Sequence, residues 1–218
     1  MARVFIIGVT GGIGHRLAPI LLANGHQVTG LHRKTEQADN LRNAGITPVA
    51  GDLMELTAET LAPLIRGHDI VVFSSGAASS GLDRTTRIDG DGPGHVLAAM
   101  KQEGISRLYL VSAFPEAGRG KDPNRRFEHY MTEKKRADAD VAASDADWVI
   151  LRPGTLLHED QDGRVNAGFA IPYGTVKRGN VAQFLAKLIE TPEIRREIIE
   201  LTDGGTEISD AVNRIVRK

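Results

Sequence analysis

The chain has 218 residues, 41% of them hydrophobic, and carries 27 Lys and Arg against 28 Asp and Glu. This length suffices for one sizeable core, and the balanced charge excludes the basic excess with which proteins hold a nucleic-acid backbone. The absence of cysteine excludes disulfides, thiolate metal sites and a cysteine nucleophile.

Short apolar runs alternate with stretches of helical periodicity along most of the chain, which is the pattern of parallel strands joined by crossover helices. Strands are predicted at residues 4–7, 27–31, 47–49, 69–73, 107–111 and 148–151. Helices are predicted at residues 13–23, 35–43, 56–65, 83–103 and 127–143, several of them followed by glycine. The sequence therefore predicts an α/β fold of Rossmann type, with a doubly wound, mainly parallel sheet flanked by helices.

The alternation changes after Arg152. Pro153-Gly154 breaks the chain, and a polar segment leads to a helix at about 181–190, a strand near 198–201 and a closing helix from about 209. With no repeat and no long linker, residues 1–218 are expected to form a single domain, in which residues 153–218 form a small C-terminal segment. The first apolar run is too short for a signal peptide or a membrane span, so we expect a cytoplasmic protein without membrane contact.

A glycine-rich turn, Gly8-Val9-Thr10-Gly11-Gly12-Ile13-Gly14, joins the first predicted strand to the first helix. Such a turn lets the backbone approach a pyrophosphate closely, while the unpaired N–H groups of the helix N-terminus face the phosphates. The first glycine is expected to permit the tight turn, the middle two the close approach, and the last the contact between helix and strand. The turn, including Thr10 and Ile13, therefore predicts a dinucleotide site.

The ends of the next strands indicate which dinucleotide is bound. The second strand ends in Leu31-His32-Arg33-Lys34, where an NAD-specific site usually has an acid. Arg33 offers a planar donor fork to a 2′-phosphate, so NADP(H) is favoured over NAD(H); the alternative is a solvated arginine. Asp52, followed by Leu53, is expected to accept hydrogen bonds from the adenine amino group. Ser74-Ser75-Gly76 ends the fourth strand beside the same crevice.

Other site chemistries find little support. No lysine follows the glycines in the spacing of an ATP phosphate loop, and there is no Gly-x-Ser-x-Gly elbow of a serine hydrolase. The seven histidines are scattered and form no metal-binding arrangement. No metal site is predicted.

These features resemble those of the atypical short-chain dehydrogenase/reductases, in particular the small NAD(P)H-binding, NmrA-like proteins that include flavin and biliverdin-type reductases. The resemblance covers nearly the whole chain. It is carried by residues 8–14, 51–53, 109–112, 147–154 and 176–182, together with Tyr130 and Lys134.

The resemblance implies a catalytic set of Ser112, Tyr130 and Lys134. Tyr130 and Lys134 are four apart in a predicted helix, so both project from one face. By resemblance, Lys134 binds the nicotinamide ribose and lowers the pKa of Tyr130, which acts as a general acid, while Ser112 hydrogen-bonds the substrate oxygen. The alternatives are a solvated basic helix face and a serine that bonds only to local backbone.

The leading hypothesis is an NADPH-dependent oxidoreductase that transfers hydride to a small carbonyl, quinone or flavin-like acceptor. The alternatives are a non-catalytic NADP(H)-binding redox sensor of the NmrA-like type, which would act on a protein partner, and a sugar-nucleotide epimerase. The C-terminal segment is expected to form the substrate side, but the expected pocket walls, residues 77–84, 114–126 and 155–169, contain no recognisable motif. The acceptor and the oligomeric state therefore stay open.

Overall fold

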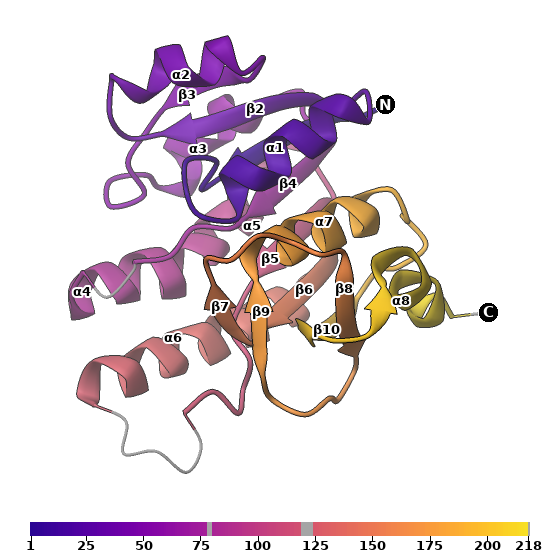
Figure 1. Cartoon of the computed structure of the whole chain (residues 1–218). Helices are drawn as coiled ribbons and strands as arrows, with labels where there is room; N and C mark the ends of the chain where they lie inside the picture. Colours follow the sequence, from indigo (N-terminus) through magenta and orange to yellow (C-terminus); the bar gives the residue numbers. More distant parts are fainter. Residues whose placement is uncertain (78–79, 119–123, 218) are drawn as a thin grey trace.

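The computed structural model describes residues 1–77, 80–118 and 124–217, and at its centre is a nine-stranded sheet (Figure 1). The sheet consists of β1 (Arg3–Ile7), β2 (Gln27–His32), β3 (Thr47–Ala50), β4 (Ile70–Phe73), β5 (Arg107–Val111), β6 (Asp147–Pro153), β8 (Arg164–Gly168), β10 (Glu197–Asp203) and β11 (Thr206–Glu207). Their order is β11-β8-β10-β6-β5-β4-β1-β2-β3. Only the pairings of β8 with β10 and β11 are antiparallel among these described strands. The predicted doubly wound, mainly parallel sheet is confirmed.

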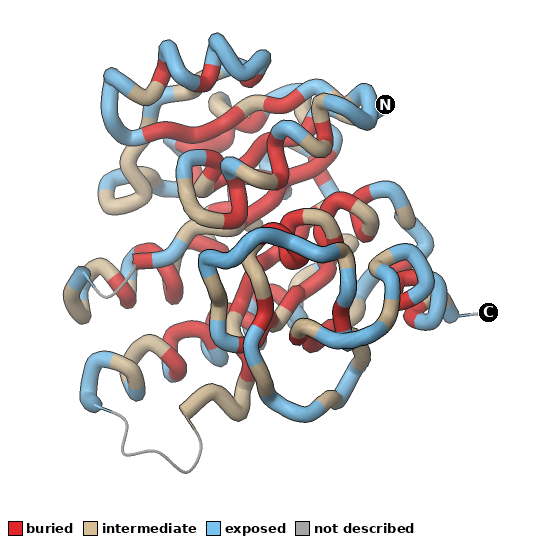
Figure 2. The backbone as a smooth tube through the Cα atoms, viewed as in Figure 1, coloured by how far each residue is buried: buried red, intermediate tan, exposed pale blue. Residues whose placement is uncertain are grey.

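Helices cover both faces of the sheet, because side chains alternate between the faces along each strand. On β1, Val4 and Ile6 belong to one apolar core, and Phe5 and Ile7 belong to the other. The first core is covered by α1 (Gly14–Ala23), α2 (Gln37–Asn43), α7 (Arg178–Ile189) and α8 (Ile208–Ile215). The second is covered by α3 (Ala58–Ile65), α5 (Gly92–Glu103) and α6 (Arg125–Ala142). Figure 2 shows buried residues concentrated on the strands and on the sheet-facing sides of the helices.

The stretch predicted as one helix over residues 83–103 is divided into three parts. A short α4 (Leu82–Arg84) leads into the π-helical segment η1 (Thr85–Asp91), and α5 follows. A π-helix has more residues per turn than an α-helix, so it turns different side chains inward. Here it buries the carboxylate of Asp89 completely.

The C-terminal segment contains strands that the sequence did not predict. β7 (Thr155–Leu157) and β9 (Thr175–Lys177) form a separate two-stranded parallel sheet, while β8 and β11 extend the main sheet. Their sequences of two to five residues lack the longer apolar run that identifies a buried strand. The buried side chain of Asn180 joins the turn before β8 to the end of β10: it accepts from the Gly163 N–H (3.0 Å) and donates to the Asp162 and Asp203 carboxylates (2.8 Å each).

Glycines end several helices as predicted. Gly25, Gly45, Gly67 and Gly104 have φ values of 81°, 78°, 78° and 68°, the left-handed conformation of a helix C-terminus. None of the helices in the described ranges combines the length and the apolar character needed to cross a bilayer.

Candidate active site

A cavity of about 990 Å³ opens where the strand order reverses, between β1 and β4. Ligands of doubly wound sheets bind at this position, outside the carboxyl ends of the strands. Of the residues proposed from the sequence, only Gly14 does not line the cavity, because it lies beneath the turn. The cavity is lined by Gly8, Thr10, Gly11, Gly12, Ile13, Arg33, Asp52, Leu53, Ser74, Ser75, Gly76, Ser112, Tyr130 and Lys134.

The glycine turn has the close packing that a nucleotide-binding turn requires. Gly8 has a φ of 96°, and a Cβ there would lie 2.7 Å from the Ser75 nitrogen. A Cβ on Gly14 would collide with the Gly8 carbonyl oxygen. α1 has no side-chain cap, and the N–H groups of Gly12, Ile13 and Gly14 have no hydrogen bond to a described residue, so they can bind phosphate oxygens. These residues fit the pyrophosphate of a dinucleotide.

The side chains after β2 and β3 are those expected around an adenosine. Arg33 is exposed at the cavity, and its backbone N–H donates to Gln37 Oε1 (3.2 Å), which also lines the cavity. Asp52 Oδ1 accepts from the Met54 N–H (3.0 Å), which fixes the turn after β3. The other carboxylate oxygen has no hydrogen bond to a described residue, so it can accept from a ligand. Gln37 was not predicted.

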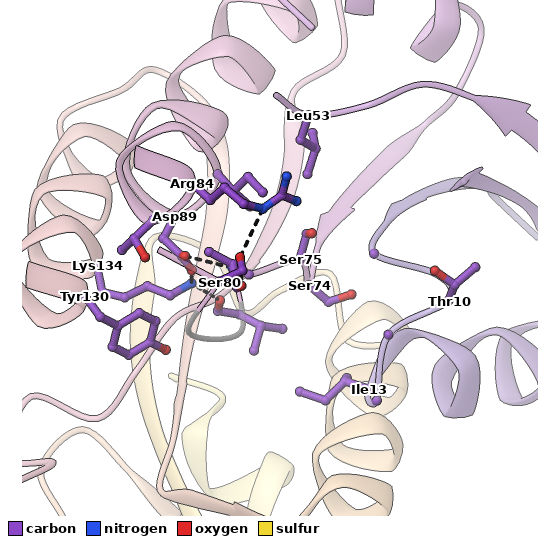
Figure 3. Close-up of a pocket in the computed structure, with 18 of the residues that line it drawn as sticks. Thr10, Ile13, Leu53, Ser74, Ser75, Ser80, Arg84, Asp89, Tyr130 and Lys134 are labelled. Atoms are coloured by element: carbon purple, nitrogen blue, oxygen red, sulfur yellow. Dashed lines mark hydrogen bonds and ion pairs between the residues drawn. The ribbon is translucent and has the colours of Figure 1, made fainter. Parts of the chain in front are cut away.

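Ser74, Ser75 and Gly76 follow β4 and form the middle of the cavity wall. Ser74 Oγ donates to the Ile7 carbonyl oxygen (3.3 Å), which ties this loop to β1. Figure 3 shows Ser74 and Ser75 between the glycine turn, marked by Thr10 and Ile13, and the side chains of Tyr130 and Lys134. The loop continues toward residues 78–79, which lie outside the described residues, as do residues 119–123 of another expected wall.

Tyr130 and Lys134 project from one face of α6 into the cavity, as predicted (Figure 3). The Lys134 ammonium lies 5.8 Å from the centre of the Tyr130 ring. It forms an ion pair with Asp89 Oδ1 (3.1 Å) and donates to the Val111 carbonyl oxygen (3.3 Å). Since an ammonium has three N–H donors, one remains for a ligand.

The expectation that Lys134 leaves Tyr130 with a lowered pKa is wrong. Burial raises the pKa of Tyr130 above its ordinary value, and the ammonium of Lys134 offsets this only in part. The carboxylates of Asp89 and Asp138 raise this pKa further. Tyr130 is therefore a protonated phenol near neutral pH, which is the form a general acid needs.

Ser112 lies at the end of β5 against a buried carboxyl group. Its hydroxyl and Asp138 Oδ1 are both buried without a well-formed hydrogen bond, although the hydroxyl is near enough to lower the pKa of Asp138. Burial is the larger effect and raises that pKa overall. Asp138 Oδ2 accepts from Arg152 Nε (2.8 Å). The Ser112 hydroxyl is thus buried beside Asp138, and it must turn away from that carboxyl group to reach a ligand in the cavity.

Sequence reasoning missed several residues of this cavity. Asp89 lies on η1, and no pattern in the sequence indicated its π-helical turn. This residue forms the ion pair with Lys134 and accepts from the Ala77 N–H (2.9 Å). Arg178, from the C-terminal segment, also lines the cavity, whereas Arg84, which donates to Ser80 Oγ (3.0 Å), belongs to the expected wall 77–84. Arg178 belongs to the family-like stretch 176–182, but a stretch of sequence does not tell which distant residue it meets. The described residues contain no cluster of His, Asp and Glu that could hold a metal.

Comparisons with known proteins also indicate a nicotinamide dinucleotide as the ligand. A family model described as NAD(P)H-binding matches residues 8–192. A Bacillus subtilis (strain 168) protein named uncharacterized sugar epimerase YhfK is 32% identical over 215 residues, covering 98% of this chain and 100% of that protein.

Solved structures of other proteins share this fold. A Bacillus halodurans protein, named as a candidate NAD-dependent epimerase/dehydratase, superposes with a TM-score of 0.87 at 28% identity, covering 98% of this chain and 100% of its own. ChuY of Escherichia coli O157:H7, described as an anaerobillin reductase, superposes with a TM-score of 0.77 at 24% identity. That match covers 94% of this chain and 98% of ChuY, and it is a likeness of fold.

Proposed function

Because the chain belongs to the NAD(P)H-binding family, as its resemblance to the atypical short-chain dehydrogenase/reductases predicted, we propose that it is an NADPH-dependent reductase. Its acceptor is a small carbonyl, quinone or flavin-like molecule. One observation carries the proposal: a single cavity is lined both by the glycine turn with Arg33 and by Ser112, Tyr130 and Lys134. A nucleotide site and an acid for proton transfer thus share one space.

In this proposal bound NADPH supplies a hydride, and the chain supplies the proton and the orientation. Tyr130 would donate its phenolic proton to the acceptor oxygen, which together with a hydride from NADPH completes a two-electron reduction and leaves NADP⁺. Solvent then returns a proton to Tyr130. Ser112 donates a hydrogen bond to the same oxygen and stabilises its developing charge. Lys134, fixed by Asp89, binds the nicotinamide ribose with its remaining N–H.

The preference for NADPH rests on Arg33. Its side chain is exposed at the cavity, beyond the carboxyl end of β2, where the ribose of the adenosine binds in such folds. A guanidinium there forms charge-assisted hydrogen bonds with a 2′-phosphate, whereas a 2′-hydroxyl offers it no charge. We therefore propose tighter binding of NADPH than of NADH.

The names of the two Bacillus relatives favour a second candidate, epimerisation of a sugar nucleotide with a retained NAD. That cycle begins with oxidation of an alcohol, for which the tyrosine must accept a proton as a phenolate. Burial raises the pKa of Tyr130 and favours the phenol instead. Reduction, which consumes a proton from Tyr130, agrees better with this environment.

Titration with NADPH and NADH, followed by an acceptor panel monitored at the nicotinamide absorbance, tests the proposal. We expect tighter binding of NADPH and its oxidation by at least one carbonyl, quinone or flavin. Copurified NAD with conversion of a sugar nucleotide and no net oxidation would identify the epimerase instead. Binding without consumption across the panel would favour a redox sensor.

A further inference from the structure

Arg178 lies over the glycine turn although it comes from the opposite end of the chain. It is the first residue of α7, directly after β9. A Cβ on Gly12 would lie 2.7 Å from Arg178 Cδ and 2.8 Å from its Nε. The guanidinium also donates to the Leu156 carbonyl oxygen of β7 (3.1 Å). The two-stranded sheet thus fixes a cation against the turn.

A second guanidinium lies beside the same turn. Arg16 of α1 donates to the Gly12 carbonyl oxygen (2.8 Å). Burial lowers the pKa of Arg178, and the positive charge of Arg16 lowers it further. Within the described part of the chain, no carboxylate forms an ion pair with either arginine. Two neighbouring cations without an acid beside them favour an anion.

We propose that Arg178 binds the diphosphate bridge of the dinucleotide, opposite the backbone N–H groups of the glycine turn. This inference deepens the proposed function and rests on its placement of the nucleotide at that turn. The planar guanidinium donates to phosphate oxygens while its bond to Leu156 keeps it in place. The C-terminal segment therefore contributes to cofactor binding as well as to the substrate side.

The proposal predicts a signature different from that of Arg33. NADPH and NADH carry the same diphosphate, so Arg178→Gln should raise the Kd of both by the same factor, about 10- to 100-fold for a lost charge-assisted contact. Arg33→Gln should weaken only NADPH. Lys187→Gln, which removes a half-buried positive charge from the same helix, is the matched control and should change neither Kd.

Calorimetry on the full chain measures the Kd values of both nucleotides and tests this assignment. Inorganic pyrophosphate is a second probe, whose binding is followed by the Tm. Pyrophosphate should raise the Tm of the wild-type protein and of Lys187→Gln, but not that of Arg178→Gln. Arg178→Lys keeps the charge and loses the planar fork, so it should bind both nucleotides with intermediate affinity. This variant tests the assignment if Arg178→Gln does not fold.

Unchanged Kd values in both Arg178 variants, or a loss confined to one nucleotide, would overturn this assignment while leaving the reductase proposal intact. A purely structural Arg178 would lower the Tm without changing either Kd. Conversely, an acceptor panel without any turnover would overturn the reductase and leave the assignment of Arg178 standing.

Discussion

Lys134 Nζ and Asp89 Oδ1 lie 3.1 Å apart, and their side chains are only 6% and 0% exposed. Both groups have a further partner, since Lys134 donates to the Val111 carbonyl oxygen and Asp89 accepts from the Ala77 N–H. A buried ion pair is tolerated when such hydrogen bonds satisfy the remaining polar atoms. Asp89 thereby ties α6 to the loop after β4 and fixes the ammonium near Tyr130.

Asp89→Asn should lower the free energy of unfolding by about 3 to 5 kcal/mol, because it leaves the ammonium of Lys134 buried without a counter-charge. Chemical denaturation measures the loss. Asp83→Asn is the matched control, since its ion pair with Arg87 (3.4 Å) is exposed and should contribute at most about 1 kcal/mol. Equal losses in the free energy of unfolding would show that the buried ion pair contributes no more to stability than the exposed one.

Tyr130→Phe should lower kcat for an accepted acceptor by about 10²- to 10⁴-fold, because the phenyl ring has no proton to donate. The Kd of NADPH should stay near the wild-type value, since the ring keeps its place in the cavity. Steady-state kinetics and a nucleotide titration measure the two quantities. Tyr173→Phe removes a hydroxyl that bonds only to Thr155 among the described residues, and it should leave kcat unchanged. If Tyr130→Phe turned over normally, another group would be the acid.

Arg33→Glu should weaken NADPH binding by about 1.5 to 3 kcal/mol or more, because it removes a charge-assisted contact and places a carboxylate near the 2′-phosphate. NADH binding should change much less. The ratio of the two Kd values, determined by fluorescence titration at one ionic strength, is the relevant measurement. A parallel loss for both nucleotides would mean that Arg33 does not contact the 2′-phosphate.

The sequence was sufficient to predict those features whose physical requirement involves only neighbouring residues. Gly8 and Gly14 are needed because the backbone leaves no room for a Cβ, and that demand depends on a few neighbouring residues. The same holds for the parallel strands, whose apolar runs are buried on both faces of the sheet. Tyr130 and Lys134 share a helix face because of their spacing alone.

The rest of the site depends on residues far apart in sequence. The sequence around Tyr130 contains a lysine four residues later, but it does not indicate the burial that raises the pKa of Tyr130. Asp89 reaches Lys134 only because η1 is π-helical. Arg178 meets Gly12 only once β7 and β9 have paired. These strands of three residues each are too short to be recognised from periodicity.

Gly14 and Gly94 allow a test of close packing within helices. A Cβ on Gly14 would collide with the Gly8 carbonyl oxygen, whereas a Cβ on Gly94 in α5 meets nothing within 4 Å. Gly14→Ala should therefore destabilise the fold and weaken nucleotide binding, because the turn must move. Gly94→Ala should stabilise the fold by about 0.5 to 1 kcal/mol through lower chain entropy and better helix propensity. Thermal denaturation distinguishes the two, and a harmless Gly14→Ala would contradict the packing argument.

Asp162 should make the C-terminal segment sensitive to acid. Its carboxylate accepts from Lys177 Nζ (2.8 Å), Asn180 Nδ2 (2.8 Å) and the Arg164 N–H (3.1 Å), which hold its pKa well below the ordinary value of 3.8. A carboxyl group whose pKa is lowered in the folded state contributes its full stabilisation of the fold at pH values above its pKa in the unfolded chain. That contribution is lost as the pH falls below about 4 toward the folded-state pKa.

Asp162→Asn should therefore be less stable than the wild-type protein near about pH 7, and the difference in Tm should shrink as the pH falls to about 3. Other carboxylates titrate alike in both proteins, so the difference between the two melting curves isolates this group. The exposed Asp160, two residues earlier, provides the control, because Asp160→Asn should give a nearly constant difference. A gap that stays constant for Asp162→Asn as well would mean that the lysine and asparagine contacts do not form in solution.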